Sequence, residues 1–225
     1  MENFASLHYF YALVMLTGAL YFFYLSRRPK DVPNYEYLVA ILIPLWSGAA
    51  YLSIAFGQGV LEQPERTIYF ARYLDWVVTT PLLLLALAFT AIIYTEKKSK
   101  TILFSLVAAD VFMILTGLIA DLSSGVVKYV WYVLGIIALL LILYIIWYPL
   151  RQIADRSGHK LSIHYRRTAA YLTCFWILYP TVWVLGPSGV GLTQQTVDVL
   201  AFIILPIFSK VGFSVLDLYG LRRLR

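Results

Sequence analysis

The 225-residue sequence is poor in charged residues and has a single cysteine. Only 13% of its residues are Asp, Glu, Lys or Arg, whereas 61% are hydrophobic, and the mean hydropathy is +0.77. A soluble domain is about 25% charged and about 45–50% apolar, and one core of this size cannot hide so much apolar surface from water. A soluble enzyme, a nucleic-acid-binding module and a disordered chain are therefore excluded. The lone Cys174 excludes an intramolecular disulfide and a cysteine metal cluster.

The N-terminus lacks the basic segment of a signal peptide, and the chain lacks internal repeats, low-complexity stretches and domain linkers. The residues Met-Glu-Asn precede the first apolar run, so we expect this run to be a retained helix rather than a cleaved leader. We therefore expect residues 1–225 to form a single domain.

Seven apolar runs are long enough to cross a membrane. A spanning helix needs about 20 mostly apolar residues, and short breaks that are polar or rich in turn residues separate the runs. The longest break, 151–167, carries five Lys and Arg residues and is expected to be a loop. The sequence thus predicts an all-α membrane protein, a bundle of seven transmembrane helices, with spans at 5–26, 36–57, 69–94, 101–120, 129–150, 168–186 and 197–219.

The distribution of basic residues predicts the orientation of the bundle. Of the 18 Lys and Arg residues, 14 fall between spans one and two, three and four, or five and six, or in the C-terminal tail. Because Lys and Arg are retained on the cytoplasmic side, we expect the N-terminus outside and the C-terminus in the cytoplasm. The net charge of +6 then reflects topology rather than a nucleic-acid partner. The expected location is a prokaryotic plasma membrane, with lipid around the bundle.

Ionisable residues inside the spans mark the candidate functional site, because each costs about 2.5–3.5 kcal/mol in the bilayer. Lys210 lies 13 residues into the last span, with apolar neighbours on both sides. A buried lysine prefers to be neutral or to be converted, most simply into a Schiff base with an aldehyde. A carboxylate at about 4 Å keeps such an adduct protonated, since the charge pair is worth roughly 4 kcal/mol at an effective dielectric of 20.

The third span offers that carboxylate. Arg72, Asp75 and Thr79 are spaced i, i+3 and i+7, so they share one helical face. We expect Thr79 to hydrogen-bond Asp75, and the Arg72 guanidinium beside Asp75 to keep the carboxylate ionised. The alternative is an Arg–Asp pair that only neutralises itself.

Three further carboxylates have two interpretations each. Asp198 and Asp217 lie near the outer and inner ends of the last span, where each is either functional or simply reaches hydrated headgroups. Asp110 is either functional or a hydrogen-bonded structural acid between helices. Trp176 and Trp183, seven residues apart on one face, are either ordinary packing residues or a clamp for a long flat polyene.

Three segments, 71–85, 176–183 and 209–213, resemble the microbial (type 1) rhodopsins, seven-helix proteins that bind retinal. The resemblance implies retinal as a covalent Schiff base on Lys210, with Asp75 as its counterion and Arg72 as a gating arginine. Gly135 and Leu139 depart from the usual lining at the ring end. The retinal pocket that the resemblance implies is lined by Tyr51, Trp76, Thr80, Leu83, Met113, Gly117, Trp176, Tyr179, Pro180, Trp183 and Pro206.

Two departures from outward proton pumps bear on the mechanism. Ala86 stands where such pumps carry the carboxylate that reprotonates the Schiff base, and Pro206 stands where the family normally carries a second counterion aspartate. Asp217 lies seven residues beyond Lys210, about 10.5 Å along a helix. The combination of Pro206, Lys210 and Asp217 is similar to the Anabaena sensory rhodopsin and xenorhodopsin branch, which contains a photosensor and inward proton pumps.

These features lead us to expect a light-driven inward proton pump, not an enzyme, with Asp217 as the proton acceptor. The alternative is a photosensor that signals to a separate soluble transducer, for which 151–167 and the basic tail 222–225 offer a docking surface. Ala86 disfavours outward pumping, and the acidic residue at position 75 disfavours chloride pumping. By analogy with the family, a homo-oligomer such as a trimer is expected.

Overall fold

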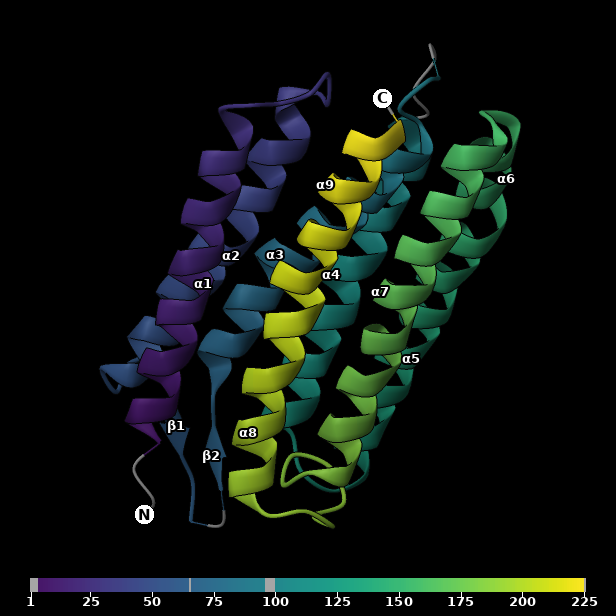
Figure 1. Ribbon diagram of the computed structural model, residues 1–225. Helices are drawn as coiled ribbons and strands as arrows, with labels where there is room; N and C mark the ends of the chain where they lie inside the picture. Colours follow the sequence, from purple (N-terminus) through teal and green to yellow (C-terminus); the bar gives the residue numbers. More distant parts are fainter. Residues whose placement is uncertain (1–3, 65, 96–99, 225) are drawn as a thin grey trace.

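The computed structural model describes residues 4–64, 66–95 and 100–224, and its helices form one elongated bundle (Figure 1). In the described residues, seven helical rods are long and apolar enough to cross a membrane, which confirms the seven predicted spans. The first four rods are single helices, and the fifth and seventh each contain a π-helical turn. The rods comprise α1 (Ala5–Ser26), α2 (Asn34–Ala55), α3 (Phe70–Ala91), α4 (Lys100–Leu122), α5 with η1 and α6 (Gly125–Arg156), α7 (His159–Leu185), and α8 with η2 and α9 (Gln195–Leu224).

A short hairpin lies between α2 and α3, at the same end of the bundle as the N-terminus (Figure 1). Strands β1 (Leu61–Glu62) and β2 (Thr67–Ile68) pair antiparallel, with Leu61 opposite Ile68. The sequence predicts only a break here, because strands of two residues leave no detectable hydrophobic alternation. We call this end of the bundle the hairpin end.

The expectation of a long loop at 151–167 is wrong. After α5 (Gly125–Ile145) and η1 (Ile146–Leu150), α6 (Arg151–Arg156) continues the same rod, and α7 begins at His159. Lys and Arg are good helix formers, so the helices continue past the last apolar residue. A π-helical turn accommodates Pro149, and Gly158, with φ of +125°, reverses the chain. Hydropathy therefore located the edge of the apolar stretch rather than the end of the helix.

The seventh rod changes its winding around Lys210. It consists of α8 (Gln195–Pro206), the π-helical η2 (Ile207–Gly212) and α9 (Phe213–Leu224). Pro206 has no N–H, so the carbonyl of Phe202, four residues earlier, loses its helical donor. The Tyr51 hydroxyl of α2 donates to that carbonyl at 2.6 Å. Tyr51 thus satisfies the carbonyl that Pro206 frees, and Lys210 sits in a wide turn of the kind often found at functional sites.

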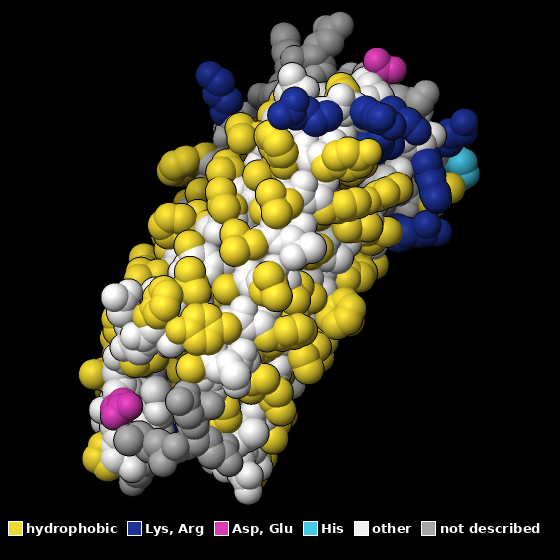
Figure 2. All heavy atoms as spheres, turned by 60° about the vertical axis from the view of Figure 1, so that its left-hand side comes forward, with side chains coloured by type: hydrophobic (Ala, Val, Ile, Leu, Met, Phe, Trp, Pro, Cys, Tyr) yellow, Lys and Arg dark blue, Asp and Glu magenta, His cyan; other side chains and the backbone are white. Residues whose placement is uncertain are grey.

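Basic side chains gather at the end of the bundle opposite the hairpin, while hydrophobic side chains cover its length (Figure 2). We call this end the basic end. Exposed aliphatic side chains between the two ends, such as Leu13, Leu20 and Leu140, are suited to lipid rather than water. Among the described residues, the basic side chains at the basic end include those of Arg27, Arg28, Arg151, Arg156, Lys160, Arg166, Arg167, Arg222 and Arg223.

The turn between α7 and α8 packs tightly against backbone at Gly189. A Cβ at this position would lie 2.0 Å from the carbonyl oxygen of Val184, and a backbone group cannot move aside as a flexible side chain can. We expect Gly189→Ala to destabilise the protein by about 1–3 kcal/mol, measured as a lower thermal unfolding midpoint in detergent. Ser188→Ala, in the same turn, is the control and should change stability by less than about 0.5 kcal/mol. An unchanged midpoint for Gly189→Ala would contradict this packing.

Candidate functional site

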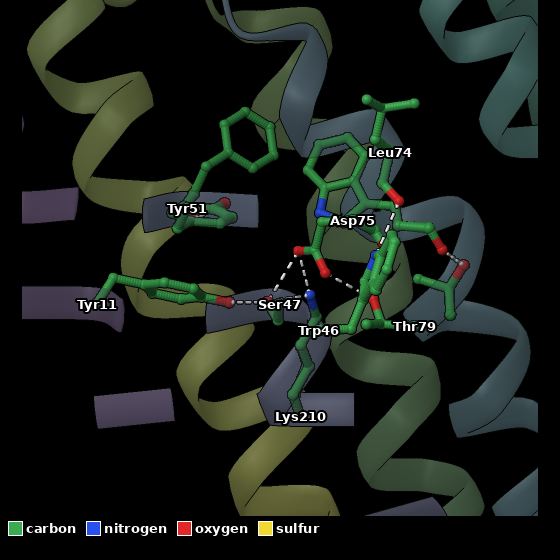
Figure 3. Close-up of polar contacts among 12 residues, drawn as sticks. Tyr11, Trp46, Ser47, Tyr51, Leu74, Asp75, Thr79 and Lys210 are labelled. Carbon is green, nitrogen blue, oxygen red and sulfur yellow. Dashed lines mark hydrogen bonds and ion pairs between the residues drawn. The ribbon is translucent and has the colours of Figure 1, made fainter. Parts of the chain in front are cut away.

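A fully buried lysine–aspartate pair lies at the centre of the bundle (Figure 3). Lys210 is 1% exposed and Asp75 is 0% exposed, and Nζ of Lys210 forms an ion pair with Oδ2 of Asp75. The structure therefore brings together the two residues that the sequence singled out, from α3 and the seventh rod. Two charges at this depth persist only as a pair with further hydrogen bonds, because desolvation of either alone is too costly.

Hydroxyl groups supply those further hydrogen bonds. Ser47 Oγ donates to Asp75 Oδ2 at 2.9 Å and accepts from Lys210 Nζ at 2.8 Å, while the Tyr11 hydroxyl lies 2.6 Å from Ser47 Oγ (Figure 3). Thr79 Oγ1 donates to the other carboxylate oxygen at 3.1 Å, as its spacing from Asp75 led us to expect. Sequence reasoning missed Tyr11 and Ser47. Their signal was a hydroxyl within an otherwise apolar run, which is too common to single them out.

The expectation that the Arg72 guanidinium lies beside Asp75 is wrong. Its Nη1 donates to Asp198 Oδ2 at 2.8 Å, and its guanidinium stacks over the rings of Tyr69 and Phe202. The physical reason is that side chains on a helix lean toward its N-terminus, which for α3 is the hairpin end. Arg72 therefore extends away from Asp75. Asp198 is 4% exposed, so the interpretation that it reaches hydrated headgroups is also wrong.

A polar cavity surrounds the Arg72–Asp198 pair near the hairpin end. Tyr73 belongs to it and donates its hydroxyl proton to Asp121 Oδ2 at 2.9 Å, while Trp183 Nε1 donates to the Tyr73 hydroxyl at 2.7 Å. Asp121 in turn pairs with Arg66 in the hairpin segment. The cavity is lined by Thr67, Tyr69, Arg72, Tyr73, Trp76, Asp121, Trp183, Ser188, Asp198 and Phe202.

A second, apolar cavity lies among α3, α4, α5 and α7. Its lining includes eight residues expected to contact retinal: Trp76, Thr80, Met113, Gly117, Trp176, Tyr179, Pro180 and Trp183. Gly135 and Leu139, the ring-end positions, also line it. Sequence reasoning missed four more lining residues, Tyr73, Ile114, Tyr132 and Ile136, while Tyr51, Leu83 and Pro206 lie outside the lining.

The apolar cavity fits retinal. Its walls are aromatic and aliphatic, and Trp76 in the lining directly follows Asp75 in the chain. Tyr179, also in the lining, places its hydroxyl 2.9 Å from Ser209, the neighbour of Lys210. Lys210 and Asp75 are not themselves in the lining, but their chain neighbours Ser209 and Trp76 place the buried amine and carboxylate close to one wall of the cavity. At the edge of the cavity, Asp110 Oδ2 accepts a hydrogen bond from Thr80 Oγ1 at 2.7 Å, which joins α4 to α3.

The half of the bundle toward the basic end contains one further buried carboxylate on the rod that carries Lys210. Asp217 is 2% exposed, so the headgroup interpretation is wrong for it. Its Oδ1 accepts from Thr90 Oγ1 at 2.8 Å and lies 3.2 Å from His164 Nε2. Ala86 on α3 is buried among apolar residues. Sequence reasoning missed His164 because it fell within the segment expected to be a loop.

Comparison with known proteins assigns the family. A family model described as bacteriorhodopsin-like protein matches residues 3–224. The chain belongs to this family. Archaerhodopsin-3 of Halorubrum sodomense is 36% identical over 209 residues, which cover 90% of this chain and 79% of that protein.

Solved structures agree with this assignment. The thermophilic rhodopsin of Rubrobacter xylanophilus superimposes with a TM-score of 0.89 at 33% identity, covering 96% of this chain and 95% of that one. A protein of Leptosphaeria maculans, described as a light-driven proton pump, superimposes with a TM-score of 0.90 at 26% identity. The match covers 99% of this chain and 97% of that one. The family binds retinal through a Schiff base to a lysine and does not consist of enzymes. The chain is thus a multi-pass rhodopsin of the plasma membrane.

Proposed function

We propose that this rhodopsin is a light-driven inward proton pump of the xenorhodopsin branch, with its basic end in the cytoplasm. The observation that carries the proposal is the buried Asp217, hydrogen-bonded by Thr90 and His164, on the same rod as Lys210. On α3, the position from which an outward pump is resupplied with protons is Ala86. Toward the basic end, this arrangement offers a proton acceptor on the rod of Lys210 and no donor at position 86.

Lys210 is the residue to which we assign the Schiff base, and Asp75 is its counterion. Retinal, when bound there, supplies a change of shape in light that redirects the proton on the Lys210 nitrogen. Beside that nitrogen, both oxygens of the Asp75 carboxylate accept hydrogen bonds, Oδ2 from Ser47 and Oδ1 from Thr79. The carboxylate is thereby fixed in place while the proton on Lys210 moves.

Asp217 is the acceptor in this proposal. It lies seven residues, about two turns or 10.5 Å along the helix axis, from Lys210 toward the basic end. A proton that leaves Nζ of Lys210 in this direction finds the Asp217 carboxylate, buried and already oriented by two hydrogen bonds. The replacement proton then enters from the hairpin end, where Arg72, Asp198 and Tyr73 line the polar cavity.

The proposal is tested by the external pH of illuminated cells that express the protein with added retinal. We expect light to raise the external pH, because protons move inward, and a protonophore to abolish the rise. Cells that express Lys210→Ala are the control and should show no response to light.

Two other outcomes would contradict the proposal in different ways. A fall in external pH would mean outward pumping without a carboxylate at position 86, so the argument from Ala86 would be wrong. A coloured protein that leaves the pH unchanged would instead be a photosensor with a separate soluble transducer. In that case the exposed basic residues Arg156, Lys160 and Arg166 would be the first surface to test for binding.

A further inference from the structure

We infer that His164 and Asp217 act as one proton-accepting unit, from which His164 releases the proton to the cytoplasm. The inference deepens the proposed function and rests on it. It assigns a role in proton transfer to a histidine that lies on a different rod from Lys210.

The contacts of Asp217 support a unit rather than an isolated acid. Its Oδ1 is shared by Thr90 Oγ1 from α3, at 2.8 Å, and His164 Nε2 from α7, at 3.2 Å. Three helices therefore converge on one buried carboxylate oxygen. Thr90 is a fixed hydroxyl donor, whereas an imidazole can gain and lose a proton near neutral pH. Of the two partners, only His164 can carry a proton onward.

Gly220 makes room for the imidazole. A Cβ at position 220 would lie 2.0 Å from Cε1 and 2.2 Å from Nδ1 of His164. Glycine within a helix costs about 1 kcal/mol relative to alanine, and Gly220 lies inside α9 (Phe213–Leu224). The close approach of the ring to the α9 backbone depends on that missing side chain, so the sequence of α9 is compatible with an imidazole in this place.

His164 lies between Asp217 and the basic end. It is in the second turn of α7, which begins at His159, and its ring packs at the level of Gly220, three residues beyond Asp217. Farther from the basic end, the Tyr171 hydroxyl of α7 donates to the carbonyl of Phe208, so the two helices run antiparallel along this contact. A proton moving from Lys210 to Asp217 and then to His164 therefore travels steadily toward the basic end.

The charges balance over one cycle. Asp217 as a carboxylate and His164 as a neutral imidazole together carry a charge of −1. The proton that leaves Nζ of Lys210 brings the unit to 0, and loss of a proton from the imidazole returns it to −1. The hydrogen bond between Asp217 Oδ1 and His164 Nε2 is the path by which the two groups share that proton.

The decisive comparison is between His164→Gln and His164→Ala in the retinal-bound protein. A glutamine amide can still donate a hydrogen bond to Asp217 but cannot hold a proton, whereas alanine removes both properties. Proton release is followed after a light flash with a pH-sensitive dye trapped inside membrane vesicles, on the side of the basic end. We expect both variants to keep their colour and to release protons about 10²-fold more slowly than the parent, the lower range for a positioned acid–base group.

Two further variants sharpen the test. Gly220→Ala leaves His164 in the sequence but displaces its ring, so it should slow release as His164→Gln does. His159→Gln makes the same substitution at an exposed histidine of the same helix, and should release protons at the parent rate.

Each contrary result has its own meaning. Parent-like release from His164→Gln overturns the inference, and slow release from His164→Ala alone would show that His164 only holds Asp217 in place. A parent protein that moves no protons inward overturns the proposed function, and the inference falls with it. An inward-pumping parent that is matched by His164→Gln overturns this inference alone.

Discussion

Replacement of Lys210 by alanine is expected to abolish the visible colour of the protein after incubation with retinal. The family holds retinal through a Schiff base to a lysine, and Lys210 has its amine buried beside a carboxylate. Alanine has no amine, so no Schiff base forms. The measurement is the absorption spectrum of the purified protein, and we expect complete loss of the visible band. Lys160→Ala, at an exposed lysine of α7, is the control and should retain the full band.

The same substitution leaves Asp75 as an uncompensated buried charge, which costs about 3–5 kcal/mol. A colourless sample could therefore be misfolded, and helical content measured by circular dichroism must accompany the spectrum. The double variant Lys210→Ala with Asp75→Asn removes both charges and should fold more stably, while remaining colourless. A visible band in either variant would mean that retinal is attached elsewhere, and the assignment of the site would be wrong.

The spans and the central pair were predictable because each depends on local rules. Runs of about 20 apolar residues have few alternatives to a membrane helix. Lys210 and Asp75 stood out because a charge inside such a run needs a partner, and the structure pairs them. Thr79 reaches Asp75 because residues four apart on a helix are neighbours. Such rules can be applied from the sequence of a single helix, or from the requirement that a buried charge has a partner of opposite sign.

Contacts between side chains on different helices could not be predicted from the sequence in the same way. The spacing of Arg72 and Asp75 placed them on one face, but the lean of the side chain and a partner on α8 decided where Arg72 binds. Tyr51 contacts the carbonyl of Phe202, which lies 151 residues away in sequence and is freed by Pro206. His164 was hidden because hydropathy placed the start of its helix too late, at the edge of the apolar run (residue 168), whereas α7 begins at His159. Each of these depends on which rods are neighbours, and hydrophobic patterns do not encode that.

Asp217→Asn is expected to stop inward proton transport while leaving the pigment coloured. Asparagine has nearly the same shape and can still accept the hydrogen bond from Thr90, but its amide cannot take up a proton. Since position 217 is about 10.5 Å along the axis from Lys210, we expect the visible band to stay and the light-driven flux to fall by about 10²-fold or more. The flux is measured as the light-induced rise in external pH per amount of pigment.

Two variants make this result specific to the carboxyl group at position 217. Asp155→Asn removes an exposed carboxylate at the basic end and should pump like the parent, because it lies outside the buried route. Asp217→Glu restores a proton-accepting group and should recover inward transport at least in part, which a purely structural role for Asp217 would not require. Unchanged flux in Asp217→Asn would show that the proton leaves by another path. The direction of transport would then have to be explained without the one buried acid that lies beyond Lys210 on the same rod.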